Sequence, residues 1–160
     1  MGWFVLNVRH RSEKKVAQVC EAHGLDYYLP LRSETKIYQR RKVTVKKPLF
    51  PGYIFVAFEP DDRIYLLRTN HIIRFIVPPS EDVLIYQLEQ IRKALEIDET
   101  LGVGNAIRQG RRVRIKAGPF MGVEGVVESA RKTSVVRLNV ELIGQAAVLE
   151  IDRDYVELLK

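Results

Sequence analysis

Few residues of this 160-residue chain belong to types that carry out catalysis, and they are scattered. The histidines stand alone, without an HExxH pattern or a second cysteine to complete a metal site. Cys20 lies on an apolar helical stripe, which favours a buried structural thiol over a nucleophile. Two acidic pairs are typical of a helix start and a turn. We therefore expect neither an enzyme nor a metal or cofactor site. The residues considered are His10, His23, His71, Asp61 with Asp62, and Asp152 with Asp154.

Cationic side chains form the second group that could do chemistry. The net charge is +6 and the pI about 9.5. Residues 1–47 hold 11 Lys and Arg against 4 Asp and Glu. Such an excess predicts a surface near the N-terminus that binds a polyanion, with nucleic acid as one candidate and an ordinary solvated surface as the alternative.

Bulk composition limits the remaining classes. A single cysteine excludes an internal disulfide, and 46% hydrophobic residues permit a packed core. No run of about 18 apolar residues is present, and the first apolar run is short and followed, not preceded, by charge. We expect a cytoplasmic monomer with no membrane partner.

Hydrophobic periodicity predicts α+β structure in the first part of the chain. Strands are expected at 3–8, 26–31, 53–58 and 72–77. A helix capped by Ser12 ends at Gly24, and a short helix covers 61–69. Residues 33–47 are charged and alternate weakly, as in a hairpin or a flexible loop.

A longer helix follows Ser80 and carries an apolar stripe at helical spacing. Its members are Leu84, Leu88, Ile91 and Leu95. After Ile97 the periodicity stops, and 98–107 is predicted to be a linker. From 108 onward, short strands separated by glycine and polar turns predict a small all-β barrel. The expected strands are 113–116, 123–128, 134–140, 146–151 and 155–158.

Two motifs carry most of the information. The run PLFPGYIFV at 48–56 fixes a Pro-Gly turn before a strand that is apolar on both faces. Its second face is either buried in the domain or docks a partner. The run at 113–127 places an alternating strand before a Gly-Pro turn, in which Phe120 and Met121 are candidate partner contacts.

The two motifs together, in this order and spacing, resemble the NusG family over nearly the full length. Further matches are Trp3-Phe4-Val5, Glu13 with Val16, Arg74-Phe75-Ile76 and Gly144. The resemblance implies an N-terminal NusG-type (NGN) sandwich at 1–97, a linker at 98–107 and a KOW (SH3-like) barrel at 108–160. The chain looks most like specialised UpxY-type and RfaH-like antiterminators, on the evidence of Pro30-Leu31-Arg32, the 38–42 loop and Pro48-Leu49-Phe50.

Within such a family, the N-terminal domain docks on the clamp helices of the polymerase β′ subunit, bridges to the β subunit and opposes pausing. The resemblance therefore implies RNA polymerase contacts at Phe4, Tyr53 and Phe55. Basic side chains would meet phosphates, and a helix–strand turn would read the non-template DNA strand in the bubble. The nucleic-acid candidates are Arg9, Arg11, Lys14, Lys15, Arg40, Arg41, Lys42, Thr69, Asn70 and His71. For Arg40, Arg41 and Lys42 the resemblance leaves open the β subunit or upstream DNA, and for Asn70 and His71 the alternative is an ordinary helix–strand turn.

A KOW domain of this family binds a ribosomal small-subunit protein or the termination factor Rho. Phe120, Met121 and Ile143 are the expected contacts here. Many members have Phe where this chain has Ile143, a departure that argues against Rho. The alternative function is a KOW-type RNA-binding protein of the ribosome or translation machinery, although the aromatic-aliphatic strand at 53–58 is unlike a surface that binds ribosomal RNA.

Overall fold

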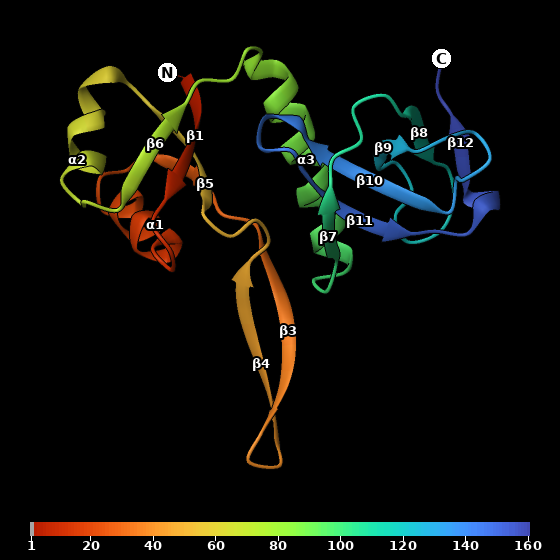
Figure 1. Cartoon of the computed structure of the whole chain (residues 1–160), viewed down its shortest axis with the longest axis horizontal. Coiled ribbons are helices and arrows are strands. Elements are labelled where there is room, and N and C mark those ends of the chain that lie inside the picture. The colour runs from red at the N-terminus through yellow and green to blue at the C-terminus, as the bar shows by residue number, and fades with distance from the viewer. Residues whose placement is uncertain (1) are drawn as a thin grey trace. The chain divides into compact units, whose positions relative to one another are not determined.

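Four antiparallel strands form the sheet of the N-terminal part of the chain (Figure 1). A computed structural model describes residues 2–160. The sheet has the order β2-β5-β1-β6 and places β1 (Gly2–Val8) and β5 (Tyr53–Phe58) at its centre. Its edges are β2 (Asp26–Tyr28) and β6 (Ile72–Ile76). The structure divides into two units, residues 1–81 and 82–160, and the expected α+β fold is that of the first.

One face of this sheet carries the core of the N-terminal unit. Helix α1 (Glu13–Ala22) contributes buried Val16 and Cys20, and α2 (Arg63–Leu67), which follows the 3-10 turn η1 (Pro60–Asp62), contributes buried Leu66. Side chains alternate along a strand, so β1 and β5 present every second residue to these helices. The strand residues in this core are Leu6, Val8, Ile54, Val56 and Phe58.

The second face of the sheet is also apolar and largely buried. Phe55 has no exposed surface and Ala57 is 2% exposed, whereas Tyr53 is partly accessible. The centre of this face is therefore covered, and the prediction of a docking patch on β5 rests on Tyr53. Only the end of β5 at Tyr53 keeps an accessible aromatic ring.

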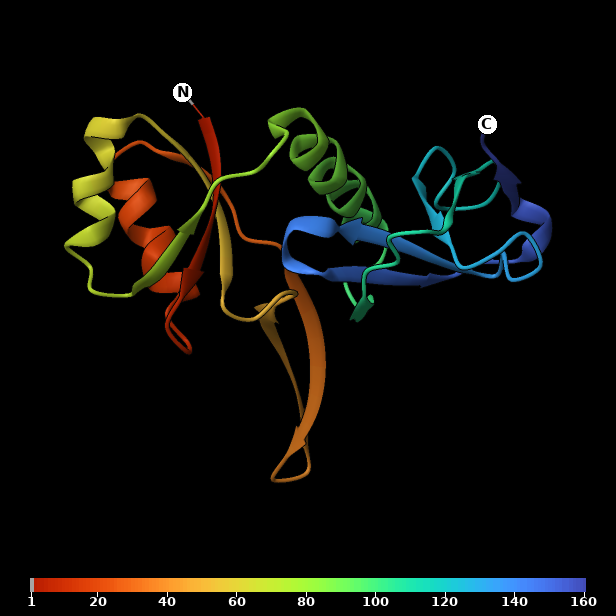
Figure 2. The same ribbon diagram turned by 45° about the horizontal axis from the view of Figure 1, so that its top comes forward.

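The segment expected to be a hairpin or loop is a regular ribbon that extends away from the sheet (Figure 2). Strands β3 (Leu31–Tyr38) and β4 (Arg41–Pro48) pair in register from Leu31 opposite Pro48 to Tyr38 opposite Arg41. The two connecting residues, Gln39 and Arg40, have φ of 48° and 64°. Positive φ at both positions is typical of a type I′ turn, which matches the twist of the strands.

The C-terminal unit is a six-stranded antiparallel sheet with the order β12-β8-β9-β10-β11-β7, and it also contains most of α3 (Glu81–Ile97). The five strands expected here are all present, which confirms the small all-β fold. They are β8 (Arg111–Ile115), β9 (Glu124–Val127), β10 (Val135–Val140), β11 (Gln145–Glu150) and β12 (Val156–Leu158).

The two compact units divide between residues 81 and 82, whereas the predicted linker is 98–107. The expected linker contains a strand, β7 (Gly102–Asn105), which pairs with β11. Helix α3 is attached to the C-terminal sheet, because the Gln90 side chain accepts from the backbone N–H of Glu124 at 2.9 Å and Gln87 accepts from that of Glu141 at 3.2 Å. Charge and periodicity could not reveal these side-chain contacts.

Two local expectations are also corrected. Ser12 stands at the N-cap of α1, but its side chain does not cap the helix. Strand β2 ends at Tyr28, earlier than expected, because the chain turns at the buried Pro30 to enter β3. Within residues 2–160, no helix is both long enough and apolar enough to cross a membrane.

We predict that replacing the turn residues by Gln39→Asn with Arg40→Gly will stabilise the ribbon. Asparagine and glycine both tolerate positive φ better than the residues that they replace. The free energy of opening the ribbon should therefore rise by about 1 kcal/mol, which corresponds to roughly fivefold slower amide exchange in β3 and β4. NMR-detected hydrogen exchange measures this. Arg40→Ala, which keeps the Cβ at positive φ, is the control, and an unchanged double variant would contradict the prediction.

Candidate nucleic-acid interface

Two loops far apart in sequence are joined at one end of the N-terminal sheet. The β1–α1 loop covers residues 9–12 and the α2–β6 loop covers 68–71. The Arg9 amide donates to the His71 carbonyl at 2.8 Å, and Ser12 Oγ lies 3.3 Å from His71 Nδ1. His71 in turn donates its amide to Thr69 Oγ1 at 3.1 Å. The structure thus brings together the two sets of residues that the sequence predicted separately to meet nucleic acid.

Each of these loops holds a non-glycine residue in the left-handed region. Arg11 has φ of 58° and Asn70 has φ of 59°, and both side chains are exposed. Asparagine tolerates this conformation, whereas arginine is disfavoured in it by about 1 kcal/mol. Strained residues cluster at binding sites, where the surrounding hydrogen bonds hold them. The strain therefore marks this pair of loops as a candidate interface.

A buried carboxylate links the same end of the sheet to the Pro-Gly turn. Glu13 is 5% exposed, and its Oε2 accepts from the Gly52 amide at 2.8 Å. The Gly52 carbonyl accepts from the Val8 amide at 2.8 Å, and φ of 89° at Gly52 requires glycine. The end of β1, the start of α1 and the turn before β5 are therefore held as one rigid support for the two loops.

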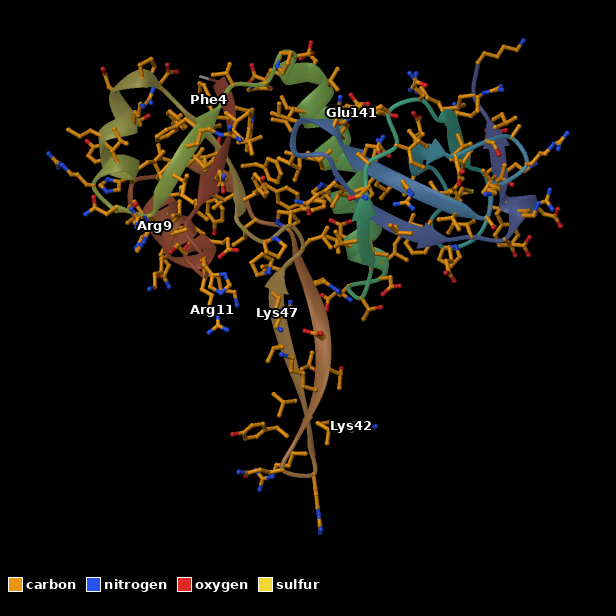
Figure 3. The ribbon with its side chains drawn as sticks, in the orientation of Figure 1. Phe4, Arg9, Arg11, Lys42, Lys47 and Glu141 are labelled. Carbon is orange, nitrogen blue, oxygen red and sulfur yellow. The ribbon has the colours of Figure 1, made fainter. Side chains whose placement is uncertain are left out.

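The base of the ribbon continues this basic surface. Lys14 Nζ donates to the Lys46 carbonyl at 2.8 Å, which ties α1 to β4. In Figure 3, Arg11 lies on the side of the unit that faces Lys47. Hydrogen bonding and repulsion from Lys47 lower the pKa of Lys36, and the charge of Arg11 adds to the effect. Lys47 also pairs with Glu34 at 3.0 Å and lowers the pKa of that carboxyl.

The predicted nucleic-acid residues fall into two groups. Arg9, Arg11, Lys14, Thr69, Asn70 and His71 lie on the joined loops and the first turn of α1. Lys15 is exposed on α1. Arg40, Arg41 and Lys42 lie at the tip of the ribbon, which eight-residue strands place about 25 Å from its base. One continuous surface therefore includes a compact cluster and an extended arm.

The predicted polymerase contacts do not share a face. Phe4 stacks on Phe58 with ring centroids 4.5 Å apart, on the face that packs against α1 and α2. Tyr53 and Phe55 project from the opposite face, because Phe4 pairs with Val56 and not with Phe55. Of the three residues, Tyr53 offers accessible surface without being part of the core beneath α1. It remains the candidate docking residue.

In the C-terminal unit, the candidate contacts occupy separate turns. Met121 is 68% exposed in the turn between β8 and β9. Phe120 borders a shallow pocket with Leu101 and Val148, and Ile143 is not among the residues that line it. Ile143 lies in the 3-10 turn η2 (Glu141–Ile143), before Gly144 at φ of 68°.

Sequence reasoning missed the exposure of three aliphatic residues on α2 and β6. Ile64 and Leu67 on α2 are 48% and 49% exposed, and Ile73 on β6 is 62% exposed. The pairing of β1 with β6 shifts register here, and Ile73 is the residue without a partner in β1. Such a bulge turns a side chain out of its alternating pattern. The short helix gave too little periodicity to show which of its leucines is buried.

Comparison with known proteins identifies the family. The family model described as transcription termination factor nusG matches residues 1–95, more than half of the chain. The chain belongs to the NusG family. The match includes the joined loops, the Pro-Gly turn and the ribbon, and it continues through most of α3.

Similar proteins cover nearly the whole chain. The transcription termination/antitermination protein NusG of Borreliella burgdorferi is 22% identical, over 98% of this chain and 97% of its own. The protein of that name from Neisseria meningitidis is 25% identical, over 97% and 96%. A solved structure of Thermotoga maritima NusG, concerned with domain interaction, has a TM-score of 0.50 at 22% identity and covers 99% of this chain and 97% of its own, which supports the fold.

We predict that Glu13→Ala will lower the free energy of unfolding by about 2 kcal/mol, because it leaves the Gly52 amide without its acceptor. Glu13→Gln keeps an acceptor oxygen and should cost less. Urea denaturation followed by circular dichroism measures both. Gln18→Ala, on the exposed side of α1, is the control, and equal stability of the two Glu13 variants would argue against the bond.

We also predict that Cys20 is unreactive in the native protein. Burial raises the pKa of its thiol to about 11, so only about 0.1% is thiolate at pH 8. Ellman's reagent at pH 8 should modify native protein at least a hundredfold more slowly than protein in guanidinium. Fast native modification would mean that the α1 core opens readily.

Proposed function

We propose that this protein is a transcription elongation and antitermination factor that binds RNA polymerase through its N-terminal unit. Membership of the NusG family supports this role, as do relatives named as termination/antitermination proteins that match along nearly the whole chain. No bond is made or broken in such a function. The factor would stabilise one state of the polymerase over another by binding it more tightly.

The observation that carries the proposal is the junction of the two loops beside the basic ribbon. Arg9, Arg11 and Lys14 are exposed together there, and the acidic Glu13 between them is turned inward to Gly52. Phosphates could therefore approach without meeting the carboxylate of the same segment. Contacts of this kind give affinity that is blind to sequence and falls steeply with salt.

The α2–β6 loop, residues 68–71, is the part that we propose reads a DNA strand. Asn70 is exposed in a left-handed conformation, and His71 is partly exposed beside it. Amide and imidazole groups can hydrogen-bond to the edges of bases that are not paired, such as those of a non-template strand. We propose this role for Asn70 and His71, with Thr69 holding the turn through its bond to the His71 amide.

For polymerase docking we propose Tyr53, with the buried Phe55 beneath it as support. An accessible tyrosine at the edge of an apolar surface is a common anchor in protein interfaces. The β′ clamp helices are the proposed partner of this surface, with the β subunit reached from the same unit. Phe4 supports the fold from the other face, and we assign it no contact.

The C-terminal unit is proposed to recruit a second partner through its exposed turns. Met121 and Phe120 on one turn, and Ile143 on another, are the proposed contacts. A ribosomal small-subunit protein is favoured over Rho, because Ile143 replaces the aromatic residue expected for Rho binding. We also propose action at selected operons, which the resemblance of the 38–42 loop and Pro48-Leu49-Phe50 to specialised members supports.

The first test is a pull-down of bacterial core RNA polymerase with the full chain. We expect Tyr53→Ala to weaken binding about tenfold, as for an aromatic interface anchor. Tyr155→Ala is the control, because this tyrosine is 40% exposed in the C-terminal unit. Circular dichroism establishes that each variant is folded, and a transcription assay at a pause site then measures the effect on elongation.

The same experiment distinguishes the proposed function from the alternative of a ribosomal RNA-binding protein. Retention of ribosomal RNA with no binding of polymerase would contradict the proposed function and favour a KOW-type RNA-binding protein of the ribosome or translation machinery. Polymerase binding that Tyr53→Ala does not weaken would keep the function and reject this docking residue.

A further inference from the structure

The ribbon β3–β4 carries a charge equal to that of the whole protein. Residues 31–48 contain seven Lys and Arg against one Glu, a net charge of +6, and the net charge of the chain is also +6. The remaining residues therefore balance to zero. They form both units, whereas the excess is placed on an arm that extends from the sheet. A ligand attracted by the net charge of this protein would meet the ribbon.

The ribbon has little support of its own. A two-stranded hairpin is at best marginally stable in water, and here the charges repel one another. Two large apolar residues near its tip, Ile37 and Tyr38, are 76% and 69% exposed. A regular structure with exposed apolar residues and like charges is well suited to being covered by a polyanion that neutralises the charges.

The two faces of the ribbon differ in the number of cations that they carry. Residues directly opposite each other share a face, so Thr35 and Thr44 lie together, with their hydroxyl oxygens 3.5 Å apart. Their face also carries Ser33, Ile37, Lys42 and Lys46, whereas the opposite face carries Arg32, Lys36, Arg41 and Lys47. The short hydroxyl side chains in the middle of the first face permit close approach to a surface, and the lysines toward either end of that face can reach its rims.

These dimensions match the major groove of B-form DNA. That groove is about 12 Å wide and admits a two-stranded β-ribbon. Strands of eight residues span about 25 Å, which is about seven base pairs at 3.4 Å each. The hydroxyl groups of Thr35 and Thr44 could bond to base edges on the floor, while the lysines and arginines meet the phosphates on both walls.

Other nucleic acids fit less well. The major groove of A-form RNA is deep and too narrow for side chains to read. Single strands are held by several aromatic residues that stack on bases, and Tyr38 is the single aromatic residue of 31–48. Shape and composition together therefore favour a DNA duplex.

We propose that β3–β4 is a DNA-binding arm that lies in the major groove of a B-form duplex, with the Thr35–Thr44 face on the groove floor. The inference deepens the nucleic-acid part of the proposed function by naming the form of its ligand. It requires no polymerase, so the two can fail separately.

The test is fluorescence anisotropy of the full-length protein with a labelled 20-base-pair DNA duplex of mixed sequence. The probes for comparison are the single strand and the RNA duplex of the same sequence. The main variant is Arg40→Ala with Arg41→Ala and Lys42→Ala. Its control removes three exposed cations of the C-terminal unit instead, Arg131, Lys132 and Arg153, so that the net charge falls equally.

We expect the DNA duplex to bind at least tenfold more tightly than either other probe. The tip variant should lose about tenfold in affinity, and its plot of log K against log salt should be shallower by about 2 to 3, because fewer counterions are released. The control should match the wild type. Methyl green, which occupies the major groove, should compete, whereas netropsin in the minor groove should not.

A second variant tests the orientation of the ribbon. Thr35→Val with Thr44→Val retains every cation and the strand-forming shape, so its salt dependence should stay unchanged while the affinity falls severalfold. Equal or better binding of the single strand or the RNA duplex would overturn the proposal, as would competition by netropsin alone. Equal losses in the tip variant and the control would also overturn it, because charge alone would then explain binding.

Polymerase experiments distinguish the two hypotheses. If the protein binds polymerase through Tyr53 but does not bind the DNA duplex, the hypothesis of a DNA-binding arm is rejected and the proposed function stands. Duplex binding by a protein that does not bind polymerase would support the arm and reject the function.

Discussion

The hydrogen bond from the Gly52 amide to the Glu13 carboxylate is the constraint on which the basic end of the N-terminal unit depends. It joins the first residue of α1 to the turn before β5, while the Gly52 carbonyl holds the end of β1. A charged acceptor that is almost buried costs several kcal/mol to remove from water, and this bond offsets part of that cost. Burial also removes one negative charge from a surface that is rich in cations.

The hydrogen bond between Glu13 and Gly52 supports two loops that each hold a residue in a strained backbone conformation. The amide of Arg9 and the side chain of Ser12 both contact His71, so each loop limits the conformations of the other. Arg11 and Asn70 can then remain in left-handed conformations that a free loop would leave. The backbone of both loops is therefore held before any ligand arrives, which lowers the entropy lost on binding.

Like charges also lie close together along the ribbon. Lys47 contacts Glu34, and hydrogen bonding with Lys47 and repulsion from it lower the pKa of the neighbouring Lys36. Self-repulsion of this kind destabilises the free hairpin, and a polyanion would relieve it. The tie from Lys14 to the Lys46 carbonyl holds the base of the ribbon next to the loops, so that the two basic regions form one surface.

Much of the fold could be predicted from local patterns. Alternation of apolar residues predicted β1, β5 and five strands of the C-terminal sheet, and the stripe of Leu84, Leu88, Ile91 and Leu95 predicted the buried face of α3. These elements depend on neighbours along the chain, and a period of 2 or 3.6 residues reports their faces directly. The two motifs also led to the family.

Other features depend on contacts between distant residues. The sequence by itself determined most of the strands and helices, where the positive charge lies and that Cys20 is buried. Tertiary structure alone decided that residues 9–12 meet 68–71, that Phe55 is covered while Tyr53 is not, and that β7 joins the sheet in place of a linker. The reason is physical: a side chain's exposure and its partners are set by what packs on it from elsewhere in the chain, and no local period records that.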